Sequence, residues 1–487
     1  MSASSSFRAF FRSSRARRGI AACAVVLAAG GLVLVRAPSP VAGQNLIPVD
    51  PTNTTLTVPS GVNEVTFQNA VASGRFALSH GKLLAGAPRT FYGELTVKAA
   101  AAQQQNQRSP LSLAVVLDTS GSMDGDKIEQ AKNSVIQLIR DMDADDEIAV
   151  IRYESDSSVV QPLARVGTVR ESLISAIREI KAGGGTNIPP ALQKGLHQLS
   201  EAGKGRVRRI VLVSDGLDST RQQAEELAKS SAERGITVSS MGIGLDFDEA
   251  YMGAVARVGR GNFAFVKDAS ALAGFLRREL KEGATTVVEG AKVTLNLPAG
   301  IRVVRAVGAD VYTNDGRTEL SIGSLFAGDE RRAIIEFTGD IPAGALSSFD
   351  SEIRLDQVGG TTTTTKIGTL ALGGAVNAAD VEESRNGAVY ASAVSALASL
   401  RQLEATDAYN RGDGRRAEAL IEQNEAEIAA AATAAPPAAA TALSRQLDAY
   451  RAAKRSFAQA PAGSDEGKAA AKAGTAQDIA NMGRSAF

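Results

Sequence analysis

The chain has 487 residues, enough for two to four domains of ordinary size, each able to bury its own core. Hydrophobic residues make up 44% of the sequence and charged residues 22%, which is typical of a globular protein. Lysine plus arginine equals aspartate plus glutamate at 53 each, and this balance excludes a nucleic-acid binder held by bulk positive charge. Cys23 is the only cysteine, so no internal disulfide can form.

The first 43 residues differ in charge from the rest of the chain. They hold six arginines and no acidic residue, and several of the arginines directly precede an apolar stretch at residues 19–35. Small residues before Gln44 then offer a cleavage site. The pattern predicts either a cleaved signal peptide or an N-terminal membrane anchor within residues 1–43. In both cases we expect the remainder of the protein to lie outside the cytoplasm, in the periplasm, at the cell surface or secreted.

Residues 44–110 contain strand-like pieces and end in a linker, and the pattern changes after them. From residue 111 to residue 282, five apolar runs alternate with amphipathic helical segments. The runs lie at 111–118, 147–154, 208–215, 236–244 and 261–266. This alternation predicts a doubly wound, mostly parallel sheet with helices on both faces, an α/β domain of Rossmann-like type. The segment 157–166 follows the second run too closely for a helical crossover, so we expect an antiparallel edge strand there.

The rest of the chain indicates two further regions. Residues 283–376 alternate in polarity and carry turn signals, which predicts a β-sandwich. We expect the strand-like part of 44–110 to complete this sandwich, so that the α/β domain at 111–282 is inserted into it. Residues 377–487 are rich in alanine and are interrupted at Gly412 and by three prolines. They predict a helical hairpin or bundle with a flexible tail.

Three polar loops follow apolar strands of the predicted α/β domain. They are LDTSGSM at 117–123, GGGTNIPP at 183–190 and VSDG at 213–216. Ligands of open α/β sheets bind beyond the carboxyl ends of the strands, so we expect these loops to converge at one edge. Together they offer two carboxylates and three hydroxyls, from Asp118, Ser120, Ser122, Thr186 and Asp215.

These five side chains supply only hard oxygen ligands, with no nitrogen or sulfur donor. Such a set favours Mg²⁺, with Mn²⁺ or Ca²⁺ as alternatives, and disfavours zinc and copper. Two anions neutralise a divalent ion, and neutral hydroxyls leave it able to accept another ligand. We expect the carboxylate of an Asp or Glu from a protein partner to take that position. The alternative is a turn in which the acid and the serines only cap a helix start.

The pattern resembles the metal-ion-dependent adhesion site of von Willebrand factor type A domains. The matching residues are Asp118-Thr119-Ser120-Gly121-Ser122, Thr186 after a glycine-rich loop, and Asp215 in Ser-Asp-Gly. All five ligand positions of the family are present in order. The resemblance implies that the serine hydroxyls bind the ion directly, and that the threonine and the aspartates bind it directly or through water. It also implies that the last helix of the domain, 268–282, can move on ligand binding.

The layout of the whole chain is similar to that of bacterial extracytoplasmic proteins with this domain. More loosely, it is similar to inter-α-trypsin inhibitor heavy chains and calcium-activated chloride channel regulators. The resemblance implies a non-enzymatic, cation-dependent module for protein binding or adhesion. The alternative is a scaffold subunit of a cell-envelope assembly in which the metal is mainly structural.

Catalysis is a third and less favoured hypothesis. The only histidines are His80 and His197, so the sequence contains no His-Glu-x-x-His zinc motif, and it contains no G-x-x-x-x-G-K-[ST] loop for nucleotide phosphates. A metal-dependent hydrolase would need a general base, and none is evident in the three loops.

Two other motifs are interpreted structurally. Asp126 is expected to cap the first helix, and Asp413 of Arg-Gly-Asp is expected to cap a helix of the C-terminal region.

Overall fold

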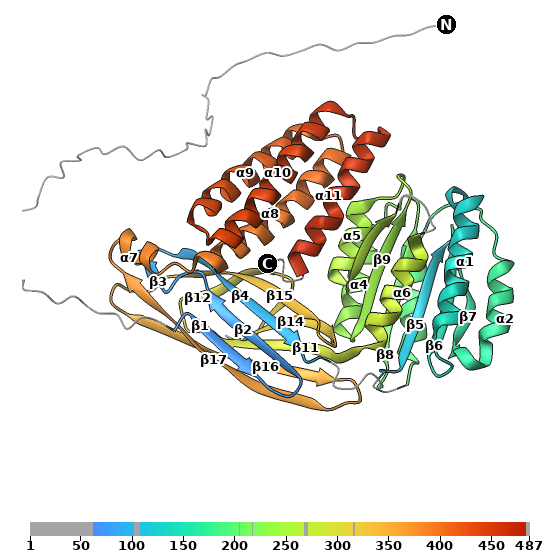
Figure 1. Cartoon of the computed structure of the whole chain (residues 1–487), viewed down its shortest axis with the longest axis horizontal. Helices are drawn as coiled ribbons and strands as arrows, with labels where there is room; N and C mark the ends of the chain where they lie inside the picture. Colours follow the sequence, from blue (N-terminus) through green and yellow to red (C-terminus); the bar gives the residue numbers. More distant parts are fainter. Residues whose placement is uncertain are drawn as a thin grey trace, which may run out of the picture. The chain divides into compact units, whose positions relative to one another are not determined.

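The computed structural model describes residues 62–101, 108–203, 205–216, 218–266, 271–314 and 317–483 (Figure 1). The signal peptide or anchor predicted within residues 1–43 lies outside these ranges. No helix within them is long and apolar enough to cross a membrane.

A six-stranded sheet forms the centre of the α/β region, in the order β10-β9-β8-β5-β6-β7. All neighbouring strands are parallel except β6 and β7, which are antiparallel. The predicted mostly parallel sheet with one antiparallel edge strand is therefore confirmed. The strands are β5 (Leu111–Asp118), β6 (Glu147–Tyr153), β7 (Ser157–Arg165), β8 (Val207–Ser214), β9 (Ile236–Ile243) and β10 (Arg260–Val266).

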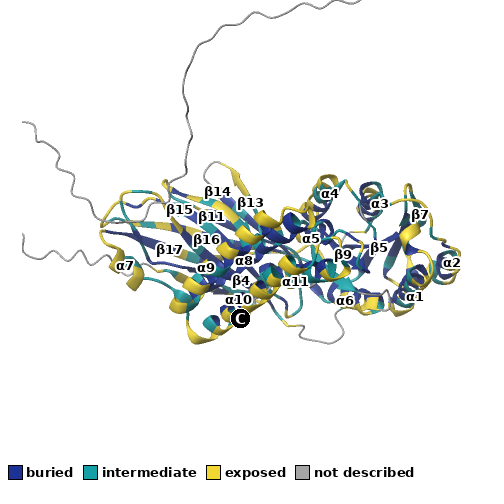
Figure 2. Ribbon diagram, turned by 90° about the horizontal axis from the view of Figure 1, so that it is seen from above, coloured by how far each residue is buried: buried dark blue, intermediate teal, exposed yellow. Residues whose placement is uncertain are grey.

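Helices cover both faces of this sheet, as the near-continuous apolar strands require. Strand β5 is buried at every position, and its alternate residues enter two different cores. Leu113 packs with helices α1, α2 and α6, whereas Val116 packs with α3, α4 and α5. Figure 2 shows the buried strands between helices whose outer faces are exposed. The helices are α1 (Asp126–Asp141), α2 (Val166–Arg178), α3 (Ile188–Ser200), α4 (Arg221–Glu233), α5 (Glu249–Val258) and α6 (Leu272–Ala284).

Two further sheets share one hydrophobic core. The first has the order β1-β2-β4-β15-β12, and the second has the order β13-β14-β11-β16-β17-β3. Strand β4 precedes the α/β region in the chain and β15 follows it, yet the two pair along their whole length, from Arg89 opposite Gly339 to Lys98 opposite Glu330. Strands from both sides of the α/β region therefore belong to one sheet. The short β3 joins β17 in parallel, a pairing that was not predicted.

The eleven strands of these two sheets have the following bounds. They are β1 (Glu64–Gln68), β2 (Ala72–Leu78), β3 (Lys82–Leu84), β4 (Arg89–Ala99), β11 (Thr286–Asn296), β12 (Ile301–Val307), β13 (Asp310–Asn314), β14 (Arg317–Phe326), β15 (Glu330–Gly339), β16 (Leu346–Gln357) and β17 (Thr362–Ala375).

The C-terminal region is helical to the end of the described residues. Its helices are α7 (Ala378–Glu383), α8 (Gly387–Asn410), α9 (Gly414–Ala434), α10 (Pro437–Gln459) and α11 (Asp465–Gly483). Asp413 accepts a hydrogen bond from the Arg416 amide and caps α9, so Arg411-Gly412-Asp413 has the structural role predicted for it. The expectation of a flexible tail is wrong for residues 465–483, because they form α11 and bury Thr475 and Met482.

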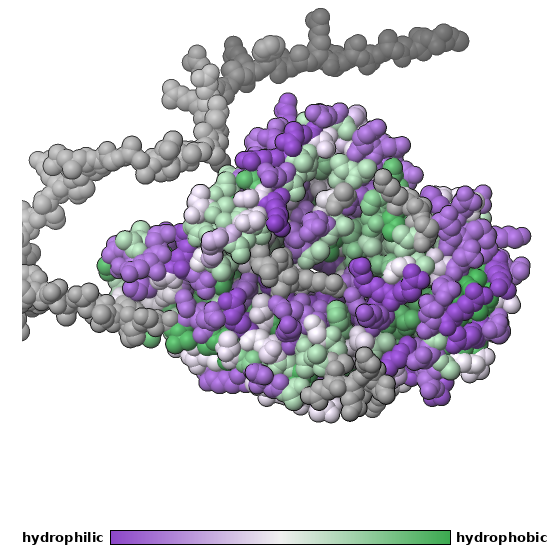
Figure 3. All heavy atoms as spheres, viewed as in Figure 1, coloured by the Kyte–Doolittle hydropathy of each residue, from purple (hydrophilic) through white to green (hydrophobic). Residues whose placement is uncertain are grey.

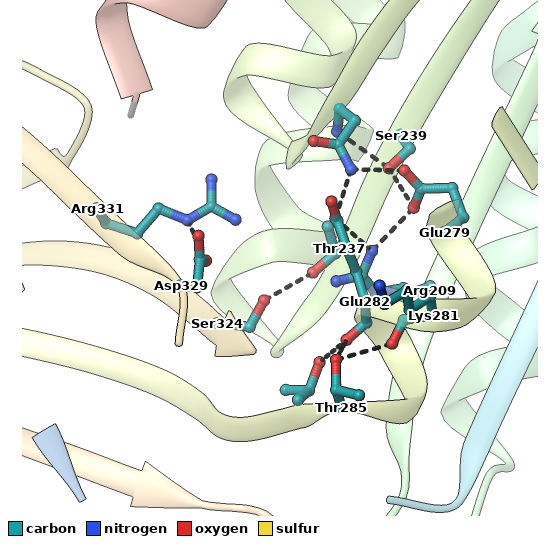
Figure 4. A network of polar contacts seen from close by, with 12 residues as sticks. Arg209, Thr237, Ser239, Glu279, Lys281, Glu282, Thr285, Ser324, Asp329 and Arg331 are labelled. Atoms are coloured by element: carbon teal, nitrogen blue, oxygen red, sulfur yellow. Dashed lines mark hydrogen bonds and ion pairs between the residues drawn. The ribbon is translucent and has the colours of Figure 1, made fainter. Parts of the chain in front are cut away.

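A buried polar cluster joins α6 to the sheet (Figure 4). Arg209 Nη1 lies 2.9 Å from Glu279 Oε2 and 3.6 Å from Glu282 Oε2. Ser239 donates to Glu279, and the Asn262 side-chain amide donates to both glutamates. The chain passes from α6 directly into β11, so this cluster fixes the α/β region at the point where it meets the two further sheets.

Candidate metal-binding site

Asp118, the last residue of β5, lies at the carboxyl edge of the parallel sheet and is completely buried. Its Oδ1 atom accepts a hydrogen bond from the Ser120 amide at 2.8 Å, and its Oδ2 atom accepts one from Ser214 Oγ at 2.7 Å. Burial raises the pKa of the Asp118 carboxyl, and the neighbouring Asp215 adds to this rise, whereas the hydrogen bonds from Ser120 and Ser214 oppose it. Within the described residues, no cation contacts this carboxylate.

A short chain of hydrogen bonds connects the two serines to Asp215. Ser120 Oγ lies 3.0 Å from Ser122 Oγ, which donates to Asp215 Oδ1 at 2.7 Å. Asp215 directly follows β8 and is also completely buried. Thr119 belongs to the same loop, but its hydroxyl donates to the Tyr153 carbonyl. The structure therefore brings four predicted ligands together, and the Thr119 hydroxyl points away from them.

Thr186, the fifth predicted residue, reaches the group from the second loop. The Gly121 amide donates to the Gly184 carbonyl at 3.0 Å, so the first two loops are tied together. Gly184 has a φ of +77°, a conformation that favours glycine. Thr186 packs against Gly216, and a Cβ at that position would collide with the threonine side chain. Thr186 thus lies beside the residue that follows Asp215, without a hydrogen bond to the other four.

Three residues near the site were not predicted as part of it. Lys127 Nζ lies 2.5 Å from Asp215 Oδ2 and 3.2 Å from the Ser122 carbonyl oxygen. Ser214, which is part of the VSDG loop at 213–216, orients Asp118 by donating a hydrogen bond to its carboxylate. Asp218 accepts a hydrogen bond from the amide of Ile188, the first residue of α3, and so joins the second loop to the third.

Asp126 does not cap α1 as predicted. The N-cap residue is Gly125, with a φ of +77°, and Asp126 is the first helical residue, where its charge favours the helix start without a capping hydrogen bond. The described residues contain no cluster of three or more His, Cys, Asp or Glu that could hold a metal. The site around Asp118 has only two acids, so its metal chemistry depends on the hydroxyls.

The donor set fits a small divalent cation. Buried charges in proteins are paired or coordinate metals, and here two fully buried carboxylates have one ammonium group between them. Two carboxylates and neutral hydroxyls are the ligands that Mg²⁺ and similar ions accept. Such an ion would be held by Asp118, Ser120, Ser122 and Asp215, with Thr186 at the rim of the site.

Comparison with known families agrees with this geometry. Residues 112–278 match the family model of the von Willebrand factor type A domain. This part of the chain is therefore a von Willebrand factor type A domain, a family that commonly mediates protein–protein interaction or adhesion.

Relatives of the chain include both bacterial and animal proteins. An uncharacterized protein of Synechocystis sp., sll0103, is 27% identical over 52% of this chain and 63% of its own length. The uncharacterized protein YfbK of Escherichia coli is 28% identical over 50% of this chain and 44% of its own length. Inter-alpha-trypsin inhibitor heavy chain H2 of mouse is 29% identical over 31% of this chain and 17% of its own length. The matches thus span less than two thirds of each relative.

Among solved structures, a von Willebrand factor type A protein from Catenulispora acidiphila superposes with a TM-score of 0.65. The match covers 87% of this chain and all of that chain at 18% sequence identity. The likeness in fold therefore extends beyond residues 112–278.

Proposed function

We propose that Asp118, Ser120, Ser122, Thr186 and Asp215 bind a divalent cation and that the loaded site binds a protein partner. Mg²⁺ is the first candidate, with Mn²⁺ and Ca²⁺ as alternatives. The observation that carries the proposal is the pair of completely buried carboxylates beside the hydroxyls of two serines, with one ammonium contact between them. When bound, the cation would act as a Lewis acid that accepts an oxygen ligand from outside the chain.

The charge around the site supports an acidic partner group. The charges of Asp118 and Asp215 balance those of a divalent ion, and the Lys127 ammonium beside Asp215 then leaves one positive charge in excess. The carboxylate of an Asp or Glu on the partner is the complementary group. Lys127, with a third of its side chain exposed, is positioned to approach that group from the rim.

The arrangement favours a binding module over the two alternatives. Ser122 is exposed and Lys127 is one third exposed, so an ion at the site is within reach of a partner, which favours binding over a purely structural role. A hydrolase would need a base at the site. His197 is exposed on α3 and His80 hydrogen-bonds to Ser79 in the β-rich part, so neither supports that chemistry.

We propose the same division of the chain as the one predicted from its sequence. Residues 44–110 and 283–376 would form a β-sandwich around an inserted type A domain at 111–282, and 377–487 a helical domain. The pairing of β4 with β15 supports the insertion. The arginines and the apolar stretch within residues 1–43 support export, so the partner is proposed to lie outside the cytoplasm.

Metal binding and partner capture are tested together. We expect saturating Mg²⁺ to raise the free energy of unfolding by about 2.7 kcal/mol at one hundred times the dissociation constant. Asp215→Asn should abolish this gain and also the Mg²⁺-dependent, EDTA-sensitive capture of a partner from envelope extract. Asp124→Asn is the matched control, because Asp124 is an exposed acid of the same loop. Equal stabilisation of both variants by Mg²⁺ would contradict the proposed site.

A further inference from the structure

A second candidate site lies at the amino-terminal edge of the parallel sheet, away from Asp118. A cavity of about 260 Å³ is enclosed there by the end of α5, the start of β10, the turn between β12 and β13, and the C-terminal half of α11. Three regions of the chain therefore contribute to its walls. The space-filling view shows the surface hollowed where the helices, the β-sheets and the α/β domain meet (Figure 3).

Four arginines and one aspartate line this cavity. Two of the arginines already have partners. Arg260 pairs with Asp310 across the wall and donates to Ser321. Arg331 lies with Nε 2.8 Å from Asp329, and Figure 4 shows its guanidinium extending from the β-sheets toward the α/β domain. These two pairs leave the charge of the wall unbalanced, because the other two arginines remain.

Arg257 and Arg278 have no ion pair or hydrogen-bond partner within the described part of the chain. Arg257 lies in the last turn of α5. Its side chain is exposed, and it lines the cavity. The loss of hydration lowers the pKa of its guanidinium and the nearby Arg221 adds to this effect, whereas the charges of Glu225 and Asp310 oppose it. Its guanidinium donors are therefore available to a bound anion at the wall of the cavity.

The remaining wall is apolar. It is formed by Val307 and Ile322 from the β-sheets, Leu400 from α8, and Ile479 and Met482 from α11. A ligand that fills the cavity therefore meets hydrocarbon on one side and guanidinium groups on the other. Its volume is just below the range of about 300 to 1,000 Å³ that is typical of small-molecule sites, which indicates a small ligand.

We propose that this cavity binds a small organic anion, with a carboxylate or phosphate head group held by Arg257 and Arg278 and an apolar body against α11. The guanidinium groups supply paired donors for the planar or tetrahedral head. Because three regions share the site, its occupation stabilises their contact. The site is separate from the proposed cation site and needs no metal.

Benzoate and phenyl phosphate are the probes, applied to the full chain at constant ionic strength and with EDTA present. We expect each to raise the melting temperature in a saturable manner and to give a measurable heat of binding by calorimetry. Benzamide, which has the same ring without a charge, should give neither effect. Inorganic phosphate should bind more weakly than phenyl phosphate, because it cannot use the apolar wall.

Two variants decide between specific binding and general anion effects. Arg257→Gln and Arg278→Gln should each weaken the binding of benzoate or phenyl phosphate at least tenfold. Arg178→Gln, at an exposed arginine of α2, is the matched control and should bind as the wild type does. Without an anion, Arg257→Gln should melt close to the wild type, since Arg257 forms no ion pair or hydrogen bond within the described residues. Undiminished binding by both cavity variants, or no binding by the wild type, would overturn the proposal.

Discussion

Two clusters of acidic side chains lie at opposite edges of the same parallel sheet, and they differ in how many of their carboxylates contact a cation of the chain. At the amino-terminal edge, Arg209 from the start of β8 contacts both Glu279 and Glu282. At the carboxyl edge, Lys127 contacts Asp215, and Asp118 accepts only neutral donors. Each cluster holds two carboxylates that are at least nine-tenths buried. Arg209 contacts both carboxylates of its cluster, which is therefore structural, whereas Lys127 contacts only Asp215, so an external cation has a place beside Asp118.

The strongest test of this comparison is Arg209→Met. Removing the guanidinium takes away the cation that contacts both buried glutamates, and we expect the free energy of unfolding to fall by about 3 to 5 kcal/mol. Urea denaturation measures the change, with Arg178→Met as a control at an exposed arginine. A loss below about 1 kcal/mol would show that the pair contributes no more than a surface ion pair does.

Another buried acid contacts no cation within the described residues and extends the comparison. Asp478 of α11 accepts a hydrogen bond from Tyr450 Oη at 2.7 Å. Burial raises the pKa of Asp478 to about 7, against the hydrogen bonds from Tyr450 and Ser399. The folded state therefore keeps a proton that the unfolded state has lost. Its contribution to stability is present at low pH and is lost as the pH rises toward 7, with no further change from this group above that value.

We expect the free energy of unfolding to drop by about 2 kcal/mol between pH 5 and pH 8 on account of this group. Asp478→Asn should remove that part of the pH dependence, because an amide stays neutral throughout. Urea denaturation at four pH values measures the slope, and Asp448→Asn serves as a control at an exposed position of α10. The same slope in both variants would assign the pH dependence to other groups.

The two edges of the sheet also differ in how far they can be predicted from sequence. Asp118 and Asp215 each follow an apolar run, and parallel strands bring their carboxyl ends to one edge whatever the strand order. Arg209 and Glu279 are 70 positions apart, on a strand and a helix, and no local pattern indicates their pairing. Only the packing of α6 on the sheet brings them together.

Two smaller features, the contact of Lys127 with Asp215 and helix α11, cannot be predicted from the local sequence pattern. Lys127 reaches back to Asp215 because the chain turns at Gly125 with a positive φ, and the apolar pattern of α1 carries no sign of that turn. The break at Pro461 in an alanine-rich sequence predicts a tail where the structure has helix α11. It is held in part by a buried ion pair between Lys472 and Glu249 of α5, 223 positions away.

The smallest expected effect concerns Lys127, the one cation that the chain does place at the carboxyl edge. Its ammonium group contacts Oδ2 of Asp215, a predicted ligand, so its positive charge opposes the arrival of a divalent ion. We expect Lys127→Met to tighten Mg²⁺ binding about tenfold, equivalent to roughly 1.4 kcal/mol, while lowering stability slightly when no metal is present. Calorimetric titration measures the affinity. Lys181→Met, at an exposed lysine outside the site, is the control, and weaker Mg²⁺ binding by Lys127→Met would mean that the lysine supports the ion instead of competing with it.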